Sequence, residues 1–148
     1  MHARTFIRRS VVSLLKNSST LKKIIGDKIY ESKIYPIDNA PAILVYTSQE
    51  QVLEHSMGYP RSQTRQLTLI IEAYAKANTN IDTTVDSLAL GIEETLSANH
   101  TLGGMIKDIT LLSSETIFSG DGDKPIAVAT LTYHLTYRIK ENKPNKLI

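Results

Sequence analysis

The sequence predicts an α+β domain in which a largely antiparallel or mixed sheet of about four strands carries two main helices on one face. Two observations lead to this prediction. Apolar residues recur at helical spacing in two segments, and other segments alternate between apolar and polar residues or form apolar runs. Both apolar helix stripes need a partner, and one face of the sheet provides it. A chain of 148 residues is long enough to bury a sizeable core.

The helices follow from the spacing of their apolar residues. A first helix is expected over residues 5 to about 16, and a longer one follows Asn80, whose side chain suits an N-cap. Between them, Thr20 is a candidate cap for a short helical turn that Gly26 ends. The apolar stripes are Ile7, Val11, Leu14 and Leu15 in the first helix and Ile81, Val85, Leu88, Ile92 and Leu96 in the long one.

Four segments carry the pattern of strands, and residues 28–32 are a possible short fifth. Residues 42–47 form a continuous apolar run, which is typical of a central strand buried on both faces. Residues 66–75 and 126–139 alternate between apolar and polar side chains. Residues 105–118 form the first strand of a hairpin with the last segment, and a turn rich in Gly and Asp joins the two.

The pattern places one domain over residues 1–139. Residues 140–148 are polar and interrupted by a proline, so we expect a flexible tail. Residues 48–62 are polar and predict a long loop or a protruding hairpin. A connection of that length in a compact domain usually has a function.

Four charged residues in or beside this connection are candidates for a subunit interface. Glu50 and Glu54 lie within it, and Arg61 and Arg65 stand at the entry to the next strand. If copies form a ring, these charges can pair across the boundary and give specificity. The alternative is ordinary exposed loop charge.

The polar face of the last strand is a second candidate interface. Its residues include Thr132, His134 and Thr136, which alternate with apolar neighbours. Because the helices cover the apolar face, we expect this polar face to be wet or covered by another copy of the chain.

No catalytic, cofactor or metal site emerges from the motifs, so we expect no enzyme and no cofactor. The chain has no Cys, which excludes disulfides, zinc–thiolate sites and Cys nucleophiles. Its histidines lack metal-ligand spacing. The Asp121-Gly122-Asp123 segment suits a hairpin tip better than a calcium loop, because the required Glu is missing at the twelfth position.

The start of the chain is basic. Six Lys and Arg residues and no acid precede Asp27. This composition fits the polar face of an ordinary first helix, and it also fits a cleaved mitochondrial leader. No segment reaches the roughly 20 apolar residues that a membrane span needs.

The order and spacing of the motifs resemble those of the tail terminator (tail-completion, minor tail protein U-like) family of long-tailed phages. The resemblance lies in the opening helix, the Pro-Ala-hydrophobic-Val-Tyr strand, the central strand before the long helix, and the closing Leu-Thr-Tyr-x-hydrophobic-Thr-Tyr strand. In this chain these are residues 7–15, 40–46, 65–72 and 129–137. Together they span most of the chain.

The resemblance implies a structural virion protein with no catalytic residues. It implies a hexameric ring that caps the tail tube, ends tail elongation and offers a surface for head joining. The implied partners are other copies of the chain, the major tail tube protein and a head-completion or connector protein. The implied location is the head-proximal end of the virion tail, after synthesis in the host cytoplasm. DNA would pass through the ring without sequence-specific binding, and Arg8 and Arg9 are the candidates to face it.

Three alternatives remain open from the sequence. The chain could be another head–tail connector or neck protein of the same fold. It could be a small ligand-binding module or enzyme that uses the Thr and His face. It could also be a mitochondrial protein whose leader, roughly the first 20 residues, is removed.

Overall fold

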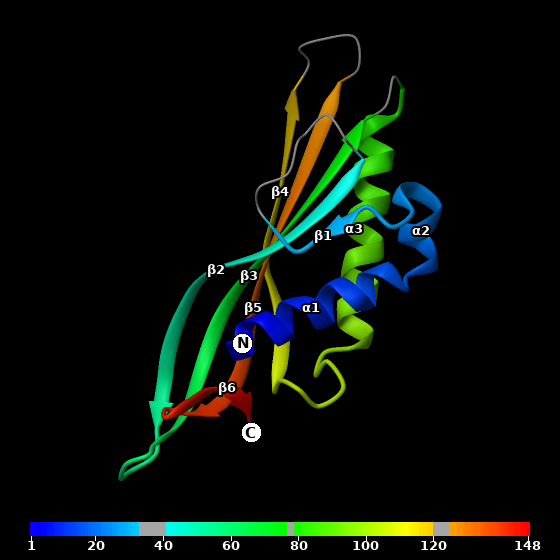
Figure 1. Cartoon of the computed structure of the whole chain (residues 1–148). Helices are drawn as coiled ribbons and strands as arrows, with labels where there is room; N and C mark the ends of the chain where they lie inside the picture. Colours follow the sequence, from blue (N-terminus) through cyan, green and yellow to red (C-terminus); the bar gives the residue numbers. More distant parts are fainter. Residues whose placement is uncertain (33–40, 77–78, 120–124) are drawn as a thin grey trace.

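The computed structural model describes residues 1–32, 41–76, 79–119 and 125–148 (Figure 1). The fold class is α+β, as predicted. The helices are α1 (Ala3–Lys16), α2 (Ser19–Ile25) and α3 (Ile81–Ala98). The strands are β1 (Ile29–Tyr30), β2 (Ala42–His55), β3 (Ser62–Lys76), β4 (Asp108–Ser119), β5 (Ile126–Lys140) and β6 (Lys143–Leu147).

The strands form one mixed sheet. Their order is β1-β2-β3-β5-β4, with β6 paired to β5. β1 runs parallel to β2, and every other pair is antiparallel. The predicted count of about four strands is wrong, because β1 and β6 bring the total to six. The twist is strong enough that the left-to-right order of the strands reverses between the top and bottom of Figure 1.

The core lies between the helices and one face of the sheet, called here the helix side. The alternation predicted for the last strand is confirmed, since every second residue of β5 from Ala127 to Ile139 is buried. In β3 the buried set includes Leu67, Leu69 and Ile71, which lie level with their counterparts on β5. The opposite face of the sheet is called the open face.

Two of the predicted helix caps differ in the structure. The N-cap of α2 is Ser18, whose hydroxyl accepts a hydrogen bond from the Leu21 N–H at 3.4 Å, so Thr20 is not the cap. Asn80 does precede α3, but it adopts a left-handed conformation and its side chain makes no capping hydrogen bond. Gly26 ends α2 as predicted, with a positive φ that favours glycine.

Residues 48–62 belong to a protruding hairpin, one of the two predicted alternatives. β2 and β3 continue past the helices, and the hairpin turns after His55 (Figure 1). The part of this hairpin from Ser48 to Ser62 is called here the arm. Register shifts at Thr47/Gln49 and Val52/Glu54 interrupt the pairing along it, and such irregularities bend a strand and increase its local twist.

The end of the chain is ordered by pairing with β5. In place of the flexible tail that its composition predicts, Lys143–Leu147 forms β6. The Ile148 N–H also donates to the Arg138 carbonyl at 3.0 Å. The candidate calcium segment Asp121-Gly122-Asp123 lies outside the described residues.

Candidate assembly surfaces

Two strands present a free edge. Within the described residues, β4 ends the strand order and pairs with β5 alone. At the other end, β1 pairs with β2 only at Ile43 and Leu44, so the rest of β2 has no described strand beside its outer edge. Such edges expose backbone N–H and C=O groups that can pair with another chain.

β4 has only some of the features that usually protect an edge strand, namely two acids, Asp108 and Glu115, and a register shift at Leu111/Ser113. Its 12 residues include no Lys, Arg, Pro or Gly. Leu112, Ile117 and Phe118 are 59%, 56% and 55% exposed, so apolar side chains flank the free edge. Long exposed apolar edges are typical pairing sites. This surface is not predictable from the sequence, because nothing in the residues themselves shows that β4 lies at the edge.

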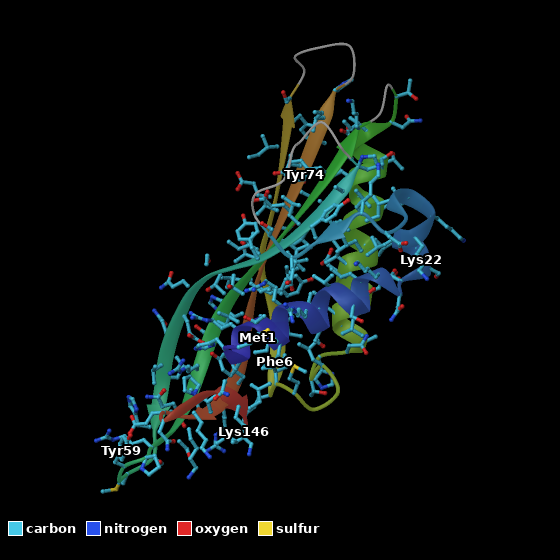
Figure 2. The ribbon with its side chains drawn as sticks, viewed as in Figure 1. Met1, Phe6, Lys22, Tyr59, Tyr74 and Lys146 are labelled. Atoms are coloured by element: carbon cyan, nitrogen blue, oxygen red, sulfur yellow. The ribbon has the colours of Figure 1, made fainter. Side chains whose placement is uncertain are left out.

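The arm carries exposed apolar side chains along its length. Val52 and Leu53 on β2 are 43% and 49% exposed. At the tip, Met57 is 98% and Tyr59 is 74% exposed, and Figure 2 shows Tyr59 at the far end of the hairpin. Because these side chains add little to the core of their own subunit, they are available to contact another protein.

Two of the candidate interface charges meet inside the subunit. The Glu50 carboxylate lies 3.4 Å from an Arg65 guanidinium nitrogen and 3.4 Å from one of Arg4, and it accepts a hydrogen bond from the Tyr137 hydroxyl. Burial and this hydrogen bond raise the pKa of Tyr137. Arg65 also donates to the Gln63 side-chain oxygen at 2.8 and 3.0 Å. This Glu50 cluster closes the lower end of the core.

The other two candidates lie on the arm. Arg61 pairs with Glu141, just beyond β5, at 3.1 Å, and its backbone N–H donates to the same carboxylate at 3.0 Å. This ion pair joins the arm at Arg61 to the residue that follows β5. Glu54 is exposed near the end of β2.

The Thr and His residues line the open face, each partly buried between neighbouring strands. His134 lies level with Thr68 on β3 and Thr110 on β4. Thr132 and Thr136 flank it on the same face of β5. Thr132, His134 and Thr136 line none of the three grooves described below, whereas Thr110 lines the groove beside β4.

A buried carboxylate also lies on the open face. Glu72 is 9% exposed and accepts hydrogen bonds from the hydroxyls of Tyr46 and Tyr74, the latter at 2.6 Å. Burial, and then the hydrogen bond to Glu72, raise the pKa of Tyr74 to about 12. The same two causes raise the pKa of Tyr46 above that of Tyr74. The three side chains tie β2 to β3 where the sheet is widest.

On the helix side, a groove follows each flank of the molecule. The groove beside β4 has a volume of about 640 Å³ and lies between α3 and β4. Glu93 and Glu94 line it, and the Tyr133 hydroxyl is buried there without a hydrogen-bond partner. Burial raises the pKa of Tyr133, and the Glu93 charge raises it further.

The groove on the opposite flank has the opposite charge. It has a volume of about 470 Å³, lies between α1 and β1, and is lined by Arg9 and Lys16 together with Glu31. Arg9 pairs with Glu31 at 3.3 Å, so one of the two predicted lumen-facing arginines is held at this flank. Arg8 is partly buried on α1.

The first helix is part of the folded core. Ile7, Val11 and Leu15 are fully buried, so removing roughly the first 20 residues as a leader would expose the helix side of the sheet. In the described part of the chain, no three His, Cys, Asp or Glu residues are grouped to hold a metal ion. No described helix is both long and apolar enough to cross a membrane.

Comparisons with known proteins place the fold. No protein-family description matches the sequence, and no curated protein matches it. The structure is similar to a chain in a solved structure of the virion of a native gene transfer agent (GTA) particle. The TM-score is 0.52 at 11% sequence identity, and the alignment covers 88% of this chain and 94% of that chain. At this identity the likeness shows a shared fold.

Proposed function

We propose that this chain is a structural subunit of a phage-like virion, with the specific role of a tail terminator. Copies form a ring, hexameric by family resemblance, that caps the tail tube, ends its elongation and offers the surface for head joining. The observation that carries the proposal is the fold shared with a chain of the GTA virion over 88% of this chain. The order of motifs along the sequence supports it separately.

The role needs no catalysis, and the proposal includes that the chain is not an enzyme. Among the residues that the structure describes, the two least exposed carboxylates are engaged by structural contacts. Glu50 is held by two arginines and a tyrosine, and Glu72 by two tyrosines. Both residues serve in this proposal to fix the geometry of the sheet from which the assembly surfaces project.

The lower end of the molecule is suited to contact the tail tube. The arm tip presents exposed Met57 and Tyr59 there, and Figure 2 shows Tyr59 at this end. Lys140, Lys143 and Lys146 line a groove of about 310 Å³ beside Pro60 of the arm tip. Apolar side chains beside lysines favour a partner surface that is partly apolar and acidic. In this proposal the opposite end of the ring receives the head-completion protein, and DNA passes through the lumen.

Imaging and tube capping test the proposal together. We expect purified protein to show rings in negative-stain images, or to form them when mixed with tubes assembled from the major tail tube protein. We also expect it to bind at tube ends and stop further growth. Protein that forms no ring and leaves tube growth unchanged at every concentration would contradict the proposal. Rings that bind the connector but not the tube would favour the alternative of another neck protein.

A further inference from the structure

We propose that neighbouring copies join edge to edge: the flank formed by α3 and β4 of one copy binds the flank formed by α1 and β2 of the next. β4 then pairs antiparallel with the free part of the next copy's β2. This inference deepens the proposed function, on which it rests, by naming the surfaces that make the ring. Three observations support it: the directions of β4 and β2, the register that sets their residues at the same level across the sheet, and the opposite charges of the two flanks.

Strand direction allows the pairing. β2 and β5 run one way, and β3 and β4 run the other way, because each neighbouring pair among them is antiparallel. When a copy is repeated by rotation with its strands kept in the same sense, β4 of one copy meets β2 of the next in opposite directions. The joined sheet therefore continues as an antiparallel sheet. The two surfaces differ, so the contact is heterologous and can close a ring.

Strand level selects which residues meet. Following the register across the sheet, Asp108 lies level with Thr136, Gln66 and Gln51, and Thr110 lies level with Gln49. The first half of β4 is thus level with the part of β2 that β1 leaves free. Rotation about an axis roughly along the strands keeps these levels, so Thr110 of one copy comes beside Gln49 of the next.

Charge complements the strand pairing on the helix side. α1 contains four basic residues and no acid, whereas α3 contains four acids and no base. α1 contacts β1 and β2, and also α3 and β6, whereas α3 contacts β3, β5 and β4. The basic groove beside α1 lies on the β1 flank, and the acidic groove beside α3 lies on the β4 flank. Edge pairing brings the Glu93 and Glu94 groove of one copy toward the Arg9 and Lys16 groove of the next. Opposite charges across a boundary steer association and reject the reversed arrangement.

A disulfide pair tests the geometry, and the absence of Cys from the chain makes the test clean. The double variant Thr110→Cys with Gln49→Cys places both thiols at exposed positions on the two edges. Under mild oxidation of the assembled protein, we expect a ladder of covalent multimers on a denaturing gel. Asp108→Cys with Gln51→Cys is a second pair from the same level. The matched control, Thr110→Cys with Lys22→Cys, keeps one thiol at the edge and moves the other to exposed α2 (Figure 2).

Charge reversal tests the flanks independently. We expect Glu93→Lys to weaken association about 3- to 10-fold at low salt, and Lys16→Glu to do the same, because rim charge pairs are modest and screened. Carrying both reversals on one chain is expected to restore most of the loss. Circular dichroism of each variant confirms that the subunit is folded.

The outcomes separate this inference from the proposed function. Rings in images without cross-links from either edge pair would overturn the edge geometry and leave the terminator role standing. Cross-linked rings that fail to cap tubes would support the geometry and contradict the role. Folded protein that stays monomeric at the highest concentration and on tubes, with no cross-link, would overturn both.

Discussion

The two halves of β2 share one strand and one partner, yet they have opposite surroundings. Ala42, Ile43, Leu44 and Val45 are buried, whereas the residues beyond Gln49 lie in the arm and are mostly exposed. The first half lies under the helices and is flanked by β1 and β3. The second half is paired on one side only. Backbone pairing with β3 is therefore common to both halves. Burial and the pairing with β1 separate the half that stabilises the fold from the half that is available for the proposed subunit contacts.

The largest effect is expected from a substitution in the buried half. Ile43 is fully buried on the helix side, so Ile43→Ala should lower the free energy of unfolding by about 3 kcal/mol. Val52→Ala in the exposed half is the matched control and should change it by less than about 0.5 kcal/mol. Urea unfolding followed by circular dichroism, at a concentration where the chain is monomeric, measures both. Equal losses at the two sites would show that the arm is packed in solution.

A smaller effect is expected where the two halves meet. Glu50→Ala removes the acceptor of the Tyr137 hydroxyl and leaves Arg65 without its carboxylate, which should cost about 2 kcal/mol of unfolding free energy. Glu50→Gln keeps an acceptor and should cost less. If Glu50 acted only between subunits, both variants would unfold like the wild type as monomers and differ only in assembly.

The next smaller loss of unfolding free energy is expected at the start of α1, beside the Glu50 cluster. The His2 side chain accepts a hydrogen bond from the Arg4 N–H at 3.2 Å, so His2→Ala should cost about 1 kcal/mol as a lost N-cap. Burial, and then the Arg4 charge, lower the pKa of His2 below its ordinary 6.5. The unfolded chain therefore takes up the proton first as pH falls.

This pKa difference gives a pH dependence with a defined sign. Stability should decrease as pH falls from about 7.5 through 6.5 and level off once the folded state is also protonated. His2→Asn keeps a capping side chain without a titrating group, so the part of the decrease that His2 causes should vanish. Unfolding curves of both proteins at several pH values measure the difference, and identical pH profiles would contradict the assignment.

The smallest effect on stability is expected at the arm tip. Met57→Ser with Tyr59→Ser replaces two exposed side chains, so the unfolding free energy should stay within about 0.5 kcal/mol of wild type. Binding to tube ends should fall, because the tip is the proposed contact. The matched control is Leu90→Ser, which alters an exposed apolar side chain on α3 away from the tip. Unchanged tube capping by the double variant would show that the arm tip makes no essential contact.

Local patterns were sufficient for the elements that bury one face. The alternation along β5 and the stripe in α3 correspond to the buried residues, because each period matches the geometry of its element. The same reasoning missed β6, whose sequence Lys-Pro-Asn-Lys-Leu has little strand propensity of its own. Pairing with β5 makes it a strand, and that partner is not visible in a local window.

The candidate assembly surfaces also combine features that local sequence predicts with contacts that only the folded chain shows. Glu50 and Arg65 are predicted from the sequence as candidates to pair across a subunit boundary, and in the structure they pair with each other within one chain. Their third partner, Tyr137, lies 87 residues from Glu50 along the chain, so no spacing rule predicts it. Gly91 lies inside α3, where glycine lowers helix propensity. In the structure a Cβ at Gly91 would lie 2.8 Å from Leu21, so the glycine is where α2 packs closely on α3.

The sequence by itself determined which residues of each helix and strand turn inward, because the periods of 3.6 and 2 are local properties of the backbone. It also determined the charges of α1 and α3. The tertiary structure decided which strands lie at the edges, which charges are used within the subunit and which flank each helix occupies. These depend on contacts between residues distant along the chain, whose pairing only the folded sheet establishes.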